Sequence, residues 1–148
     1  NMQGEFVMVK QYRPSISQYT LEFPAGGLMN NEKPIDAAKR EFIEETALSI
    51  DFIYLGDFKL MMNRTNIKDH IFFGINPKKN DRFIPENGIE VILIDRKKLS
   101  KLSVSGEFKQ LAGLGIIQLV SNYFELDIMT DSMESIFEKF KSRLNDKC

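Results

Sequence analysis

The chain has 148 residues, enough for one domain with a buried core, and its 43% hydrophobic and 28% charged residues exclude a disordered polypeptide. Its 20 basic and 21 acidic side chains give a net charge of −1, which argues against a nucleic-acid partner because no broad basic surface is available. No apolar run is long enough to span a membrane, and the only cysteine, Cys148, cannot form an internal disulfide, so we expect a cytoplasmic protein.

The first half of the chain predicts two strands, a glycine loop and a helix. Residues rich in β-formers indicate strands at 5–11 and 19–23. The sequence Pro24-Ala25-Gly26-Gly27 then predicts a loop, because glycine adopts backbone angles that other residues resist. Pro34 suits the first turn of a helix, which we expect over residues 34–46.

The second half predicts three more strands, a polar loop and two helices. The expected strands are 53–58, 71–75 and 90–94, with the polar loop at 77–85, and the apolar run 108–124 indicates a long helix. An amphipathic tail helix follows from the helical spacing of Met133, Ile136, Phe137, Phe140 and Leu144. We therefore expect an α+β domain over residues 1–128. The helix within 129–148 would pack on that domain or form a dimer contact, and a homodimer would cover an open sheet edge.

Three glutamates on the predicted helix share one face. Glu41, Glu44 and Glu45 have i, i+3 and i+4 spacing, so their carboxylates repel one another unless a positive charge lies among them. Arg40 lies four residues before Glu44 and can pair with it, but one arginine does not neutralise three carboxylates. Mg²⁺ would do so, because it prefers oxygen ligands. The alternative is an acidic face that is simply turned to solvent.

The glycine loop and the acidic helix form one long motif, which favours the metal site. Gly26 is followed after five residues by Glu32 and after seven more by Arg40-Glu41-Phe42-Ile43-Glu44-Glu45-Thr46-Ala47-Leu48. This spacing resembles the Nudix hydrolase box, except that Ala47 stands where the family has glycine. That position often takes a left-handed backbone, in which alanine costs roughly 1 kcal/mol. The flanking segments 11–14 and 21–26 resemble the ADP-ribose and nucleoside-diphosphate-sugar pyrophosphatases of that family.

The resemblance implies a mixed β-sheet sandwiched between helices (α/β/α). Because the strand before Arg13 lies close to the start of the chain, we expect N-terminal strands of the family to be missing. The implied metal ligands are the Ala25 carbonyl, Glu41 and Glu45, with Glu44 as a further ligand or as the group that activates water. The other implied roles are substrate binding by Arg13, Glu22, Gly26 and Gly27, orientation of Glu44 by Arg40, and support of the metal by Glu32.

The resemblance also implies Mg²⁺-dependent hydrolysis of a pyrophosphate bond in a nucleoside diphosphate sugar, with Mn²⁺ able to replace Mg²⁺. For ADP-ribose the products would be AMP and ribose 5-phosphate. A catalytic base from a later loop is implied as well, and Glu107 is the first candidate, ahead of Glu86 and Glu90. An equally good explanation of Glu107 is an acidic residue at a helix start. Two other functions remain open: hydrolysis of a different nucleoside diphosphate derivative, and ligand binding without catalysis.

Overall fold

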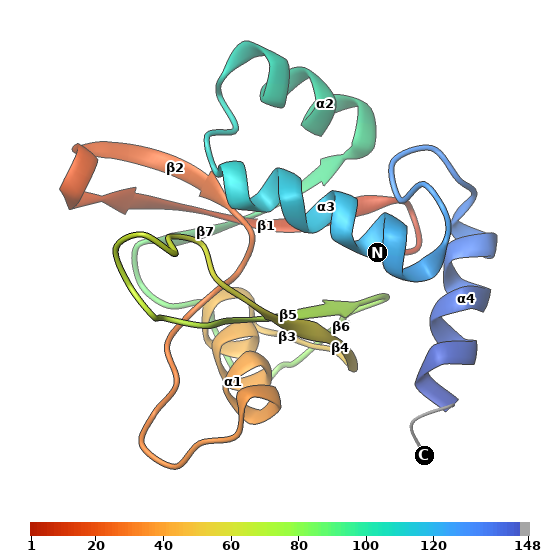
Figure 1. Cartoon of the computed structure of the whole chain (residues 1–148), viewed down its shortest axis with the longest axis horizontal. Coiled ribbons are helices and arrows are strands. Elements are labelled where there is room, and N and C mark those ends of the chain that lie inside the picture. The colour runs from red at the N-terminus through yellow and green to blue at the C-terminus, as the bar shows by residue number, and fades with distance from the viewer. Residues whose placement is uncertain (146–148) are drawn as a thin grey trace.

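The computed structural model describes residues 1–145, in which strands lie between helices. Helix α1 (Pro34–Thr46) lies on one side of the strands, and α2 (Arg96–Ser105) and α3 (Leu111–Phe124) lie on the other (Figure 1). Helix α4 (Met133–Asn145) stands at one end of the molecule (Figure 1). The α+β class and the placement of the sheet layer between helices are therefore as the sequence predicted.

The largest sheet has three strands in the order β2-β1-β7. Strand β1 (Glu5–Arg13) is central and pairs antiparallel with both β2 (Gln18–Glu22) and β7 (Ile89–Asp95). A short 3-10 turn at Pro14–Ile16 connects β1 to β2. This hairpin positions the end of β2, and hence the glycine loop that follows it, beside α1.

Two further strand pairs complete the strand layer. Strand β4 (Phe52–Phe58) pairs antiparallel with β5 (Asp69–Gly74), and the two-residue strands β3 (Leu48–Ser49) and β6 (Lys78–Lys79) pair in the same sense. Every strand pairing within residues 1–145 is antiparallel. The mixed β-sheet that the sequence led us to expect is therefore wrong: the strands form antiparallel sheets. Strands β1 and β5 belong to different sheets, and residues of both strands line one cavity.

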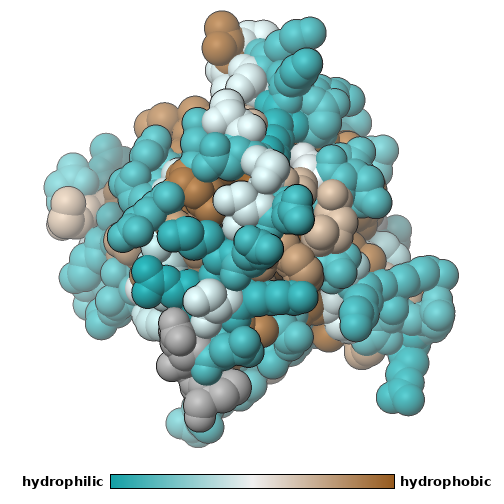
Figure 2. All heavy atoms as spheres, turned by 90° about the vertical axis from the view of Figure 1, so that its right-hand side faces the viewer, coloured by the Kyte–Doolittle hydropathy of each residue, from teal (hydrophilic) through white to brown (hydrophobic). Residues whose placement is uncertain are grey.

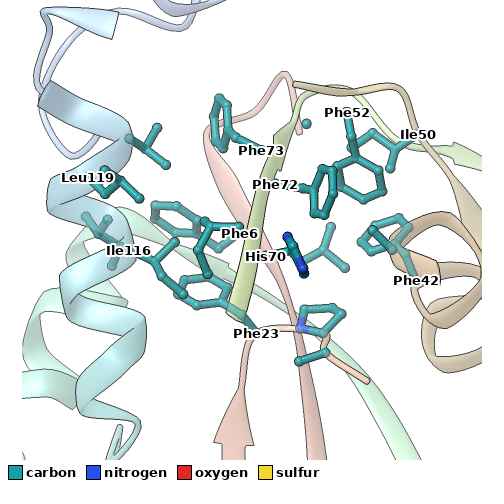
Figure 3. Close-up of a pocket in the computed structure, with 18 of the residues that line it drawn as sticks. Phe6, Phe23, Phe42, Ile50, Phe52, His70, Phe72, Phe73, Ile116 and Leu119 are labelled. Atoms are coloured by element: carbon teal, nitrogen blue, oxygen red, sulfur yellow. The ribbon is translucent and has the colours of Figure 1, made fainter. Parts of the chain in front are cut away.

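This cavity has a volume of about 700 Å³ and is lined mainly by apolar side chains. Figure 3 shows that side chains on both sides of β5 line the cavity. Some lie on the side of β5 that faces α3, and others lie on the side that faces α1. Side chains on the α3 side include Phe6, Phe23, Ile116 and Leu119, and those on the α1 side include Phe42, Phe52, His70 and Phe72 (Figure 3).

Two hydrophobic clusters hold the layers together. The smaller one joins the three-stranded sheet to α2 and the segment after it, through Met8, Ile94, Leu99 and Phe108. The larger cluster joins β4 to α3 and α4 and consists of Ile53, Ile75, Val120, Phe124, Ile128, Ile136 and Phe140. Helix α4 thus contributes Ile136 and Phe140 to the packing of the body, whereas the face of the molecule that carries α4 is mostly hydrophilic (Figure 2).

The observed helices differ from the sequence predictions at two places. Helix α2 was not expected; it begins after Asp95, whose carboxylate accepts a hydrogen bond from the Lys98 N–H at 2.8 Å, and it ends at Gly106 with φ of 78°. The helix expected from residue 108 begins at Leu111, so Glu107 is not at a helix start and that explanation of it is wrong.

Among residues 1–145, no helix combines the length and the apolar character that a membrane crossing requires. Cys148, on which the expected reducing environment rested, lies outside the described residues.

Candidate functional site

Helix α1 has the bounds that the sequence predicted, Pro34 to Thr46. Pro34 occupies the first turn, where its missing N–H costs nothing. At the other end Ala47 has φ of 54°, in the left-handed region, and its N–H donates to the Ile43 carbonyl at 2.8 Å. The expected left-handed exit from the helix is therefore present, and alanine adopts it in place of glycine.

Arg40 gathers three carboxylates at the exposed side of this helix. Its Nε and Nη2 donate to the two oxygens of Glu32, both at 2.9 Å, and its Nη1 donates to Glu41 at 2.7 Å and to Glu44 at 3.0 Å. Nη2 also donates to the Gly27 carbonyl at 2.8 Å. The pairing of Arg40 with Glu44 follows the spacing in the sequence, and Glu32 and Gly27 extend it to the preceding loop.

These bonds change the acidity of the groups that share them. The Arg40 guanidinium, together with the Met29 N–H, lowers the pKa of Glu32 to about 2. The same carboxylates, Glu32 first and then Glu41, raise the pKa of Arg40. The loop from Gly27 to Glu32 is therefore tied to α1 by the Glu32–Arg40 ion pair, in which both groups stay charged across the physiological pH range.

Glu45 lies apart from this network and is buried, with 5% of its surface exposed. Its carboxylate accepts a hydrogen bond from the Ala25 N–H at 3.1 Å. Its pKa is raised to about 7, chiefly because it is buried and also because Glu41 is negatively charged; the Ala25 N–H and Arg13 oppose the shift. Within residues 1–145 no lysine or arginine is bonded to this carboxyl, and a buried carboxyl beside a glycine loop is suited to a bound cation.

Gly26 lets the loop approach the helix closely. A Cβ at this position would overlap the carboxylate of Glu41, so a larger residue would displace that side chain. The cavity described above reaches Ala25, Gly26 and Glu41, which gives a small molecule access to this side of the helix. The loop, Glu41 and Glu45 are thus brought together as the motif predicts.

Arg13 is held by a second ion pair across the β1–β2 hairpin. Its Nε and Nη2 donate to the two oxygens of Glu22 at 2.8 and 2.6 Å, and Thr20 donates to Glu22 as well. The bond with Glu22 raises the pKa of Arg13, and Arg13 followed by Thr20 lowers the pKa of Glu22. This pairing was not predicted from the sequence. The register places Arg13 opposite Gln18 and Glu22 opposite Val9, so Arg13 and Glu22 share a face of the hairpin without being direct partners.

The candidate bases lie in different surroundings. Glu107 accepts a hydrogen bond from the Ser105 hydroxyl at 3.0 Å and lines a shallow cleft with Lys10, Tyr19 and Lys109 on the side of the sheet covered by α2. Its role as a base stays a prediction, because no contact in residues 1–145 joins it to the acidic helix. Glu86 donates its backbone N–H to the Glu44 carbonyl at 2.8 Å, whereas Glu90 forms an exposed ion pair with Lys10 at 3.6 Å.

The residues present fit a hard divalent cation by their chemistry. Glu41, Glu45 and the Ala25 carbonyl supply only oxygen atoms, and Glu45 is a buried carboxyl that no cationic side chain neutralises among the described residues. The side chains are not pre-arranged as a cluster: within residues 1–145, no three acidic, histidine or cysteine side chains converge as metal ligands, because Arg40 holds Glu41 and Glu44. Binding would therefore require Glu41 or Glu44 to turn from Arg40.

Comparison with known proteins agrees with this site. A family model described as the NUDIX domain matches residues 1–105. The ADP-sugar pyrophosphatase of Mus musculus is 52% identical over 40 residues, which cover 27% of this chain and 18% of that protein. The match thus spans less than a fifth of the mouse relative.

The fold has a solved counterpart as well. A crystal structure of a protein described as an ADP compounds hydrolase matches with a TM-score of 0.72 and 16% identity, covering 84% of this chain and 69% of that chain. At this identity the likeness shows the fold, whereas the family is shown by the domain model. Because that model spans residues 1–105 of 148, and these include the glycine loop, Arg40 and the acidic helix, the chain belongs to the Nudix family.

Proposed function

We propose that this protein hydrolyses the pyrophosphate bond of an ADP-sugar in a Mg²⁺-dependent reaction, with ADP-ribose giving AMP and ribose 5-phosphate. The observation that carries the proposal is the network in which Arg40 bonds Glu32, Glu41 and Glu44 together with the carbonyl of the glycine loop at Gly27. A surface acidic face would not need an arginine bonded to three carboxylates and a loop. The match to the mouse ADP-sugar pyrophosphatase supports the substrate class.

Glu41, Glu45 and the Ala25 carbonyl would hold the metal, with Glu44 next to them. When bound, Mg²⁺ would neutralise negative charge on the phosphate oxygens and lower the pKa of a water molecule bound to it. In hydrolysis the water oxygen bonds to one phosphorus, the bond from that phosphorus to the bridging oxygen breaks, and the bridging oxygen leaves with the other phosphate. Arg40 fixes the orientation of Glu44, which is the group in this network with the most exposed side chain, at 43%.

Arg13 would contact a phosphate of the substrate. Its guanidinium lies on the hairpin that leads into the glycine loop, and its positive charge acts to lower the pKa of Glu45. An arginine placed there stabilises negative charge that develops on the phosphate oxygens during bond cleavage. Glu107 remains the proposed base, which requires the segment between α2 and α3 to move towards α1 when substrate binds.

A magnesium-dependent substrate screen tests the proposal. Purified protein is incubated with ADP-ribose, other nucleotide sugars, nucleoside triphosphates and dinucleotides, and AMP release is measured with Mg²⁺, with Mn²⁺ and with EDTA. We expect release of AMP from ADP-ribose with either metal, and loss of release in Glu41→Gln and Glu45→Gln. If the protein hydrolysed only nucleoside triphosphates or only dinucleotides, those compounds and not ADP-sugars would be its substrate class. Tight binding of ADP-ribose without turnover, unchanged in Glu45→Gln, would identify a non-catalytic ligand-binding module.

A further inference from the structure

One face of the β1–β2 hairpin carries a chain of hydrogen bonds from Thr20 through Glu22 to Arg13. Thr20 and Glu22 are two residues apart in β2, so their side chains point to the same face of the sheet. Gln18 shares that face, and it is the direct partner of Arg13 in the strand register. The register thus places Thr20, Glu22 and Arg13 on one face of the hairpin, and the Arg13 side chain extends along that face to reach Glu22.

The carboxylate of Glu22 is the fixed centre of this chain. Its Oε1 accepts from Arg13 Nε at 2.8 Å and from the Thr20 hydroxyl at 2.5 Å, and its Oε2 accepts from Arg13 Nη2 at 2.6 Å. The Glu22 side chain is 13% exposed, whereas that of Arg13 is 42% exposed. The bonds of Thr20 and Arg13 occupy both oxygens of Glu22, which prevents the carboxylate from rotating.

This arrangement leaves part of the Arg13 guanidinium available. Of its five N–H groups, two donate to Glu22, and Nη1 has no hydrogen-bond partner among the described residues. An arginine held in this way presents its remaining donors in one direction, so less side-chain freedom is lost when an anion binds. Glu22 bonds the edge of the guanidinium formed by Nε and Nη2. Nη1 lies away from this edge and can therefore still donate to an anion.

The hairpin itself does not depend on this chain. Strands β1 and β2 share five paired positions, and the rings of Tyr12 and Tyr19 pack edge to face at 5.4 Å on the other face. We infer that Thr20 and Glu22 are positioning residues that orient the Arg13 guanidinium towards a substrate phosphate. The inference rests on the proposed function only for the identity of the phosphate compound.

The kinetic test compares Thr20→Val with Thr20→Ser. Valine keeps the branched shape that suits a strand but removes the hydroxyl, whereas serine keeps the hydroxyl. For ADP-ribose hydrolysis we expect Thr20→Val to raise KM about threefold to tenfold with kcat within about twofold of the wild type, and Thr20→Ser to restore the wild-type KM. An unchanged KM in Thr20→Val, or equal impairment in Thr20→Ser, would overturn the inference.

A second measurement is independent of turnover. The Nε–H signal of Arg13, assigned by its absence in Arg13→Lys, is followed by NMR while inorganic pyrophosphate and Mg²⁺ are added. We expect Thr20→Val to speed solvent exchange of this proton about tenfold and to weaken pyrophosphate binding by the factor seen in KM. If the wild type hydrolyses no nucleotide sugar, the proposed function fails while this measurement still decides the inference. Exchange and pyrophosphate affinity equal in wild type and Thr20→Val would overturn it.

Discussion

The buried carboxyl of Glu45 predicts an unusual dependence of stability on pH. Burial, helped by the charge of Glu41, raises its pKa from 4.5 to about 7 in the folded protein. Between these two values the folded protein holds a proton that the unfolded chain has released. The free energy of unfolding of the metal-free protein therefore falls as the pH rises from about 4.5 to about 7. This is the opposite of the effect of a carboxylate whose pKa is lowered by an ion pair.

The size of the effect follows from the shift. A rise from 4.5 to about 7 corresponds to about 3 kcal/mol of unfolding free energy at pH 8, as an upper limit. Glu45→Gln removes the titration but keeps an oxygen that accepts from the Ala25 N–H. In EDTA we expect the variant and the wild type to be equally stable near pH 4.5, and the variant to be more stable by up to about 3 kcal/mol at pH 8.

Urea denaturation at four pH values between 5 and 8, in EDTA, measures this difference. Glu138→Gln, which removes an exposed carboxylate from α4, controls for the change in net charge. A difference between wild type and Glu45→Gln that stays constant over the pH range would refute the reasoning. Addition of Mg²⁺ should then stabilise the wild type at pH 8 more than Glu45→Gln, because the variant lacks a metal ligand.

Four more changes give separate tests. Gly26→Ala places a methyl group against the Glu41 carboxylate, so calorimetry should show weaker Mg²⁺ binding while urea denaturation shows little change. Arg40→Lys leaves three N–H donors in place of the five hydrogen bonds that Arg40 donates, and we expect kcat/KM to fall about 10- to 100-fold. Phe140→Ala empties a core position next to Phe73 and Phe124 and should lower the unfolding free energy by about 3 to 5 kcal/mol; a change below about 1 kcal/mol would mean that α4 does not pack as described. Removal of metal with EDTA should abolish AMP release, and Mn²⁺ should restore it.

The acidic helix could be predicted closely because its signals are local. Pro34 marks its first turn, and the spacing of Arg40 and Glu44 predicts the ion pair that forms at 3.0 Å. The left-handed exit at Ala47 was expected from the motif and is present. Each of these features depends on residues within two or three helical turns, for which the geometry of the helix alone is sufficient.

Contacts between distant segments could not be predicted in the same way. The pairing of Arg13 with Glu22 depends on the hairpin register, which the sequence does not specify by itself. The start of α3 was placed too early because an apolar run does not distinguish a helix from an extended segment that is buried. Phe108 is 3% exposed in the core, and the Gln110 side chain accepts the Phe23 N–H at 3.0 Å, so these residues are held outside the helix, which begins at Leu111.

The charges around Arg40 limit what this corner of the molecule can hold. Glu32, Glu41 and Glu44 share one guanidinium, so two negative charges remain when all three carboxylates are ionised. That surplus equals the charge of one divalent ion, whereas a potassium ion would leave half of it uncompensated. Glu45 lies outside this network, and with a pKa of about 7 it is about half ionised at pH 7. The three carboxylates that Arg40 bonds are therefore matched in valence, as well as in their oxygen atoms, to a single divalent ion.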